Sequence, residues 1–223
     1  MNNYFHRQIK LWGEEKQRAL QEREIAIIGC GGLGSSLGIA LGSCGIGKIH
    51  LVDFDKVEIH NIHRQIAFTK NDVGRYKAEA LAKVIESRSD FVEALPFTHD
   101  FDTFAATGIV PDLIIDATDN LPIRAKIDRY AREIHRPWIY GSVEAFHGQV
   151  CFFEESDFGA FQISDKEPAG IAAPIVMHIA SLQANLALRY LVGLPVRKDL
   201  LYYLYFDDHG ELITQKFQIP KSE

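Results

Sequence analysis

Residues 24–34 read EIAIIGCGGLG, a short apolar run followed at once by a glycine-rich turn. The run at residues 25–28 is typical of a buried strand, and Gly29, Gly31 and Gly34 give the spacing G-x-G-x-x-G at the start of a helical pattern. Asp53 ends the next apolar run, about twenty residues later. Glycines let a phosphate approach the backbone, and an acid can accept hydrogen bonds from ribose hydroxyls. The stretch therefore predicts an adenine-nucleotide site, which NAD, FAD or ATP could fill.

From Glu24 onward, short apolar runs alternate with amphipathic segments, as in successive βαβ units. Strands are predicted at residues 25–28, 48–52, 91–96, 112–116 and 138–140, and helices at 33–44, 72–88, 100–107 and 121–135. This order predicts an α/β fold of the Rossmann-like, doubly wound type with a mainly parallel sheet.

The C-terminal third has a different pattern of apolar residues. It predicts a strand at residues 148–153, an irregular connection at 154–173, an apolar helix at 174–192, and a hairpin of strands 201–206 and 211–218 around Asp208-His209-Gly210. We expect these strands to extend the sheet in antiparallel order.

Near the N-terminus, a helix at 14–22 follows an arm, residues 1–13, that is too short for its own core and must dock on another surface. The absence of linkers or repeats predicts one domain over residues 1–223.

Composition restricts the function classes. The chain is 47% hydrophobic, enough for a full core, and its net charge of −6 argues against partners such as nucleic acid or anionic membrane. Its apolar runs are too short for a membrane span, and its start lacks a signal-peptide pattern, so we expect a cytoplasmic protein. The three cysteines form no CxxC pair. Cys30, inside the glycine turn, is expected to be a packing residue and not a nucleophile.

Charged residues cluster beyond the predicted strands, at the edge where open α/β sheets bind ligands. Arg64 and Lys77 could flank a triphosphate, and Asp119 suits Mg²⁺, which takes one or two carboxylates together with phosphate oxygens. The chain contains no G-x-x-x-x-G-K-[ST] loop. Cleavage between the α- and β-phosphates is therefore favoured over transfer of the γ-phosphoryl group.

Seven ordered motifs, spanning nearly the whole chain, resemble the ThiF/MoeB/HesA adenylyltransferases and the adenylation domains of ubiquitin-activating enzymes. The motifs are His6 to Gly13, the glycine loop Gly29 to Gly34, Asp53-Phe54-Asp55, Asn61-Ile62-His63-Arg64-Gln65, Gly74 with Lys77, Thr118-Asp119-Asn120 with Arg124, and the stretch Ala169 to Pro174. The resemblance implies ATP-dependent adenylation of the C-terminal Gly-Gly carboxylate of a small ubiquitin-like sulfur-carrier protein, of the thiamine or molybdopterin type.

The resemblance also implies a role for each site residue. The loop glycines Gly29, Gly31, Gly32 and Gly34 would cradle the nucleotide, Asp53 would hold the ribose, Asn61, Arg64 and Lys77 would contact the phosphates, Asp119 would hold Mg²⁺, and Asp55 and Asn120 would complete the nucleotide site. Arg7 would reach ATP on the neighbouring subunit, which implies a homodimer with the arm docked on its partner.

The chain departs from many bacterial relatives because it lacks the two CxxC pairs of their structural zinc site. Aromatic and aliphatic residues stand where the first pair would lie, and we expect them to form a small hydrophobic core: Phe152, Phe153, Phe158, Phe161 and Ile163. A partner surface is the alternative for this group. With Lys166 or a neighbour at the position of a crossover cysteine, no covalent thioester or persulfide is expected there.

Three other functions stay open. An NAD-dependent oxidoreductase would explain the glycine loop and Asp53 but leaves Arg64, Lys77 and Asp119 without a role. A non-catalytic partner subunit would have lost its nucleotide residues, which are present here. A tRNA-modifying dehydratase of the same superfamily fits less well with the acidic charge balance.

Overall fold

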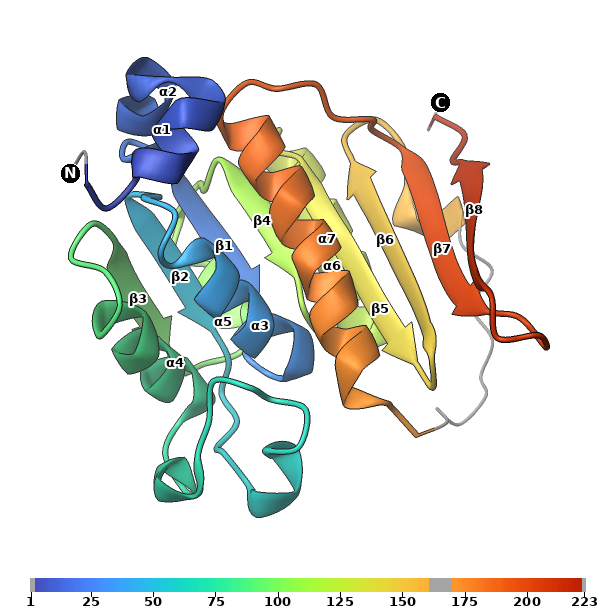
Figure 1. Ribbon diagram of the computed structural model, residues 1–223, viewed down its shortest axis with the longest axis horizontal. Coiled ribbons are helices and arrows are strands. Elements are labelled where there is room, and N and C mark those ends of the chain that lie inside the picture. The colour runs from blue at the N-terminus through green and yellow to red at the C-terminus, as the bar shows by residue number, and fades with distance from the viewer. Residues whose placement is uncertain (1–2, 161–169, 222–223) are drawn as a thin grey trace.

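The computed structural model describes residues 3–160 and 170–221, which form one continuous sheet with helices on both faces (Figure 1). Its eight strands are β1 (Glu24–Ile28), β2 (Lys48–Val52), β3 (Glu93–Phe97), β4 (Leu113–Asp116), β5 (Trp138–Glu144), β6 (His147–Phe153), β7 (Leu200–Phe206) and β8 (Leu212–Gln218), in the order β3-β2-β1-β4-β5-β6-β7-β8. Strands β1 to β5 are parallel, and β6 to β8 extend them in antiparallel order. The predicted fold class is confirmed.

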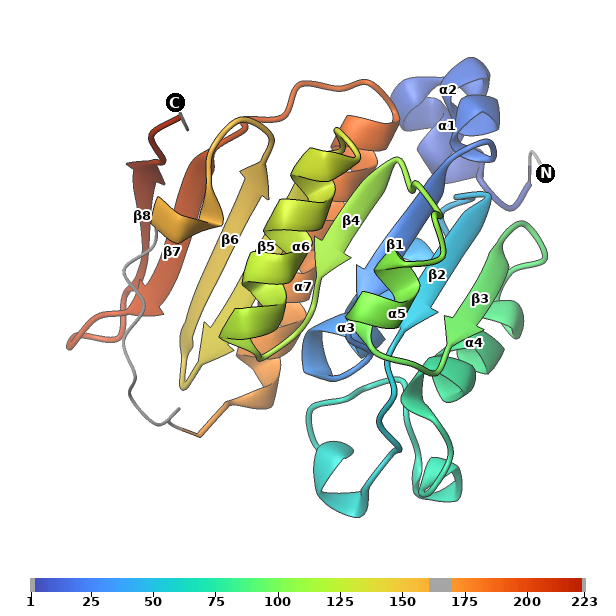
Figure 2. The ribbon, with the colours of Figure 1, turned by 180° about the vertical axis from the view of Figure 1, so that it is seen from behind.

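Helices cover the two faces of the sheet unequally. Helices α3 (Gly32–Leu41), α4 (Lys77–Glu86) and α7 (Ala173–Leu191) pack on the face seen in Figure 1, and α5 (Phe101–Ala105) and α6 (Leu121–Glu133) pack on the face seen in Figure 2. Each face has its own hydrophobic core. Gly38 lets α3 approach α4 closely, because a Cβ there would lie 2.7 Å from a methyl carbon of Leu81. The carboxyl ends of the parallel strands β1, β2 and β4 are where a fold of this type binds ligands.

Several element boundaries differ from the prediction, and two of these differences have a physical cause in the structure. The helix predicted at 72–88 begins only at Lys77, because Gly74 adopts a φ of +88° that a helix cannot continue, and a short 3₁₀ turn, η2 (Lys70–Asp72), precedes it. The strand predicted at 91–96 begins at Glu93. Phe91 instead packs against Phe5, with ring centroids 5.0 Å apart. In both cases a tertiary or backbone constraint overrides the local pattern.

The N-terminal arm is helical and rests on its own chain. Helix α1 (His6–Trp12) and helix α2 (Glu14–Leu20) lie at one end of the sheet (Figure 1). Phe5 is only 1% exposed, and the Gln8 side-chain amide donates to the Cys44 carbonyl at 2.8 Å. The surface that the arm needs is thus supplied in part by the segment before β2.

The aromatic group predicted to pack near the missing zinc pairs is buried wherever the structure describes it. Phe152, Phe153 and Phe158, the last in the 3₁₀ turn η3 (Phe158–Ala160), are at most 2% exposed, and Phe153 stacks on Trp138 at 4.7 Å. Phe161, Ile163 and Lys166 lie outside the described residues. The packing interpretation is confirmed for the three described aromatics.

Among described helices, none combines the length and apolar character needed to cross a bilayer.

Candidate nucleotide-binding site

The glycine loop joins β1 to α3, and its glycines have separate duties. Gly29 has a φ of +93°, and a Cβ there would lie 2.8 Å from the Ala117 carbonyl oxygen. A Cβ on Gly34 would lie 1.9 Å from the Gly29 oxygen, and one on Gly32 would lie 2.9 Å from a methyl carbon of Val176. A Cβ on Gly31 would lie 3.6 Å from the Gln65 amide nitrogen, which is an ordinary van der Waals contact. The protein's own packing therefore requires three of the glycines but would tolerate a side chain at Gly31, where close approach of a phosphate to the backbone would explain the glycine.

Asp53 follows β2 and lies directly beside this loop. Its carboxylate accepts the Cys30 backbone N–H at 2.7 Å and the Asp55 backbone N–H at 2.7 Å. Burial raises the pKa of Asp53 above its ordinary value, and the Cys30 N–H and the Lys77 ammonium partly oppose that shift. The carboxylate is thus held rigidly at the loop, where it can still accept from a ribose hydroxyl. Burial and the Asp53 carboxylate raise the pKa of the Cys30 thiol, which agrees with a packing role for Cys30.

The long connection between β2 and α4, residues 54–76, lies at the carboxyl ends of the parallel strands (Figure 1) and carries or adjoins the basic residues of the site. Lys77 begins α4 and is nearly buried; its ammonium donates to the Asp55 carboxylate at 2.7 Å. Asp55 therefore serves as the counter-ion of Lys77. Asn61, in the 3₁₀ turn η1 (Ile59–Asn61), accepts the Glu58 N–H through Oδ1, so its amino end is the part that could reach a phosphate. Arg64 contacts its own turn, donating to the His60 carbonyl.

Asp119 and Asn120 extend from the loop after β4. This loop is held by a buried ion pair, in which Arg124 on α6 donates to Asp116 at 3.1 Å and to the Thr118 carbonyl at 2.6 Å. Asn120 caps α6 through its side-chain oxygen, and Asp119 is exposed. Within residues 3–160 and 170–221, no ion pair holds the Asp119 carboxylate. Sequence reasoning grouped Arg124 with the nucleotide motif, but its contacts show that it positions the loop.

The donor set at this edge fits Mg²⁺ bound through a nucleotide. No group of three or more His, Cys, Asp or Glu side chains in the described part of the chain could hold a metal ion by itself. Asp116 is committed to Arg124, which leaves Asp119 as the carboxylate at the strand ends that can face solvent and phosphate oxygens. Mg²⁺ accepts such a site, because it takes few protein ligands when phosphates supply the rest.

Arg7 lies at the amino ends of the parallel strands, whereas the site lies at their carboxyl ends. It is exposed on α1, whose neighbour Gln8 contacts Cys44, a residue that precedes β2. The glycine loop, Asp53 and Asp119 all follow the strands, so Figure 1 places them at the other end of the sheet from α1. Within one chain, Arg7 is therefore separated from the residues predicted to act with it.

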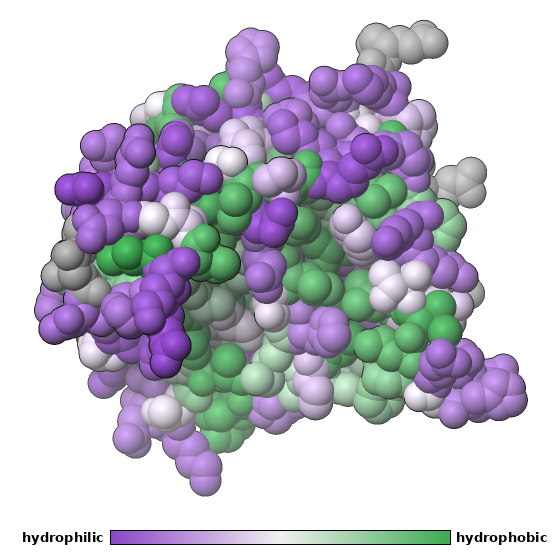
Figure 3. All heavy atoms as spheres, turned by 45° about the horizontal axis from the view of Figure 1, so that its top comes forward, coloured by the Kyte–Doolittle hydropathy of each residue, from purple (hydrophilic) through white to green (hydrophobic). Residues whose placement is uncertain are grey.

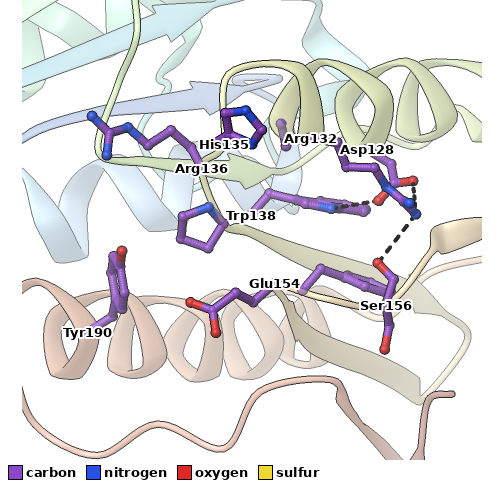
Figure 4. A pocket seen from close by; sticks show the side chains of 11 residues that line it. Asp128, Arg132, His135, Arg136, Trp138, Glu154, Ser156 and Tyr190 are labelled. Atoms are coloured by element: carbon purple, nitrogen blue, oxygen red, sulfur yellow. Dashed lines mark hydrogen bonds and ion pairs between the residues drawn. The ribbon is translucent and has the colours of Figure 1, made fainter. Parts of the chain in front are cut away.

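A cavity of about 470 Å³ also lies away from this site, at the edge where the parallel strands begin (Figure 4). Three of its lining residues take part in ion pairs: Arg132 binds the lining residue Asp128 at 3.1 Å and also Asp157 at 2.9 Å, and Glu154 pairs with Lys198. A second cavity of similar volume is lined by residues 197–199 and 218–221. Neither cavity contains a residue of the predicted nucleotide site.

Comparison with known proteins identifies the family of the chain. The model of the ThiF family matches residues 5–223. The chain is 30% identical over 221 residues to the sulfur carrier protein adenylyltransferase of Thermus thermophilus, covering 89% of this chain and 82% of that protein. It is 30% identical over 164 residues to the adenylyltransferase and sulfurtransferase MOCS3-1 of Zea mays, but spans only 35% of that protein's length and 73% of its own.

The fold recurs in solved structures. A crystal structure of E. coli MccB with ATP superposes on the whole chain with a TM-score of 0.87 at 20% identity, and the match covers 73% of that protein. At that identity the likeness shows the fold. The family model, which spans nearly all of the sequence, confirms the family that the seven motifs suggest. The chain belongs to the ThiF family, and the two curated relatives above are adenylyltransferases.

Proposed function

We propose that the protein uses ATP to adenylate the C-terminal Gly-Gly carboxylate of a small ubiquitin-like sulfur-carrier protein. The observation that carries the proposal is the convergence, beyond the carboxyl ends of the parallel strands, of the glycine loop at Gly31, the carboxylate of Asp53, the ammonium of Lys77 and the exposed carboxylate of Asp119. An oxidoreductase would need the first two and has no use for the others. The name of the Thermus relative supports a sulfur carrier as the substrate.

The chemistry asks little of the protein. A C-terminal carboxylate is ionised at neutral pH, so no general base is needed. One of its oxygens forms a bond to the α-phosphorus, the bond from that phosphorus to the bridging oxygen breaks, and pyrophosphate leaves with the electron pair. Lys77 and Arg64 provide positive charge, and Asn61 provides a donor, for the phosphate oxygens. Mg²⁺ held at Asp119 would neutralise further phosphate charge.

The binding part of the site follows the same logic. Asp53 would accept the ribose hydroxyls, and the backbone at Gly31 would face a phosphate. Asp55 keeps Lys77 charged at this edge through their ion pair. Pathway and location stay predictions: the carrier could serve thiamine or molybdopterin synthesis, and we infer a cytoplasmic enzyme.

The exchange of labelled pyrophosphate into ATP tests the proposal directly. Purified protein with Mg²⁺ and candidate carriers ending in Gly-Gly is expected to show exchange that depends on the carrier, because the adenylation step is reversible. NAD binding serves as the parallel control. Absence of exchange with every carrier, together with tight NAD binding, would replace this proposal by the oxidoreductase reading.

A homodimer would complete the site. Arg7 is exposed at the end of the sheet opposite its own nucleotide residues, so a role in ATP binding would be at the site of a neighbouring copy. Leu11, on the same helix, is 73% exposed. Figure 3 brings this end of the molecule forward and shows hydrophobic residues gathered in a hollowed part of a largely hydrophilic surface. These features support docking of the arm region on a second copy of the chain.

Mixing two inactive variants tests whether Arg7 acts across the dimer. Arg7→Ala and Asp119→Ala are each expected to lose most pyrophosphate exchange, for lack of phosphate charge neutralisation and metal binding respectively. A mixed dimer contains one site with an intact Asp119 and a neighbouring Arg7, so mixing after subunit exchange should restore part of the activity. Full activity of Arg7→Ala alone, or no recovery in mixed dimers that are shown to form, contradicts the role.

A further inference from the structure

Gln65 lies against the glycine loop although the motif containing it gives it no role. Its backbone N–H donates to the Asn61 carbonyl, and its own carbonyl accepts from Phe68, both at 3.1 Å, so the turn holds it firmly. The side chain is 3% exposed. Its amide nitrogen lies 3.6 Å from the position that a Cβ on Gly31 would occupy. The amide therefore lies within contact distance of the loop at Gly31, the glycine that the protein's own packing does not require.

The amide is also incompletely satisfied. Its oxygen Oε1 is buried and has no hydrogen-bond partner among the described residues. Turning the amide over would exchange oxygen and nitrogen and still leave one buried end unpaired. A buried polar group without a partner lowers stability, whereas an apolar group of the same shape would not. Packing alone therefore gives no reason for a glutamine at this position.

We propose that Gln65 is a nucleotide-binding residue whose amide donates a hydrogen bond to an anionic oxygen of the phosphate lying at Gly31. The inference rests on the proposed function, since it takes ATP as the ligand of the loop. An uncharged donor beside exposed backbone N–H groups adds to the anion site without adding another cation beside Lys77. The unsatisfied oxygen is the stability cost of placing that donor at the loop.

This arrangement makes stability and affinity change in opposite directions. Gln65→Met keeps the length and volume of the side chain but removes both the donor and the unpaired oxygen. We expect its melting temperature to be equal to or higher than that of the wild type, and its dissociation constant for ATP with Mg²⁺ to rise about tenfold. Gln65→Glu should weaken ATP binding further, because it places a carboxylate beside the phosphate.

Gln183 offers a matched control. It is fully buried on α7, and its Oε1 also has no hydrogen-bond partner among the described residues, but its amide nitrogen donates to the Asp116 carbonyl of β4 at 2.7 Å. Gln183→Met is expected to melt at a lower temperature, since it loses that bond, and to bind ATP as the wild type does. The contrast separates loss of a loop donor from replacement of a buried glutamine.

The experiment is calorimetric titration of each full-length variant with ATP and Mg²⁺, and with adenosine, beside thermal melts. Weaker ATP binding by Gln65→Met, with unchanged adenosine binding and no loss of stability, supports the inference. Equal ATP binding, an equal loss for adenosine and ATP, or a joint fall in affinity and melting temperature overturns it. Failure of the proposed function is distinct, since the wild type itself would then not bind ATP.

Discussion

Replacing Asp119 with alanine is expected to reduce carrier-dependent pyrophosphate exchange by about a thousandfold, which corresponds to about 4 kcal/mol of transition-state stabilisation. The reason is that Asp119 is the exposed carboxylate on the β4 loop, and Asp116, the other acid there, is committed to Arg124. Without Asp119, the charge on the phosphate oxygens would lose its metal partner at the protein. The measurement is the exchange rate at saturating ATP over a range of Mg²⁺ concentrations.

Two comparisons sharpen this test. Asp53→Ala should mainly raise the KM for ATP, because Asp53 sits at the loop as a ribose acceptor and not at the reacting phosphate. Asp208→Ala, in the exposed turn between β7 and β8, should change neither constant. If Asp119→Ala exchanges pyrophosphate at the wild-type rate, the assignment of the metal and of the reaction falls.

Replacing Arg124 with methionine is expected to lower the free energy of unfolding by about 3–5 kcal/mol near neutral pH. Asp116 is fully buried, and Arg124 supplies its counter-charge at 3.1 Å. Arg124 also donates to the Thr118 and Gly141 carbonyls, so three acceptors lose their donor at once. For a domain of this size, the melting temperature should fall by about 10 °C. Thermal and denaturant unfolding measure both quantities.

The same variant should recover stability at low pH. Burial raises the pKa of the Asp116 carboxyl, and the charge of Arg124 opposes that rise in the wild type. Without Arg124 the folded-state pKa rises further above the unfolded value, so the folded form binds the proton more tightly. Unfolding free energy then falls as pH rises through this window and returns as pH falls toward the ordinary carboxyl pKa. The stability gap to the wild type should narrow on acidification.

Lys126 provides the control on the same helix. Its ion pair with Asp102 is exposed on both sides, so Lys126→Met should cost less than about 1 kcal/mol and show no comparable dependence on pH. A loss for Arg124→Met as small as this would mean that the buried pair does not hold the Thr118–Asp119 loop. Asp116→Asn combined with Arg124→Met should be more stable than Arg124→Met alone, because the buried charge is removed.

Most of the fold could be predicted because its signals are local. The parallel strands are apolar runs separated by amphipathic helices, and a βαβ crossover has one favoured hand, so their order follows with few alternatives. Elements shifted where a distant residue decided the boundary: Phe91 packs on Phe5 instead of joining β3, and the left-handed φ of Gly74 delays α4. A pattern of hydrophobicity carries neither kind of information.

The sequence predicted which residues belong to the candidate site better than it predicted the role of each. The glycine spacing, Asp53 and Asp119 could be named because each follows a strand end, where parallel strands converge. Packing requires glycine at Gly29, Gly32 and Gly34 but not at Gly31, and this difference depends on atoms of Ala117, Gly29 and Val176 that the fold brings near. Arg124 reads in the sequence as one more cation of the nucleotide motif, and only its burial on Asp116 shows a positioning role.

The sequence by itself determined the doubly wound sheet, its antiparallel extension and the family, since periodicity, glycine spacing and motif order are all written along the chain. Only the tertiary structure decided which side chains are free to meet a ligand. Three contacts illustrate this: Lys77 pairs with Asp55, Arg124 pairs with Asp116, and the Gln65 amide lies beside Gly31 with an oxygen that has no partner among the described residues. Whether a charged or polar group acts on a ligand or on the protein depends on its burial and its partners, and these arise only when the chain is folded.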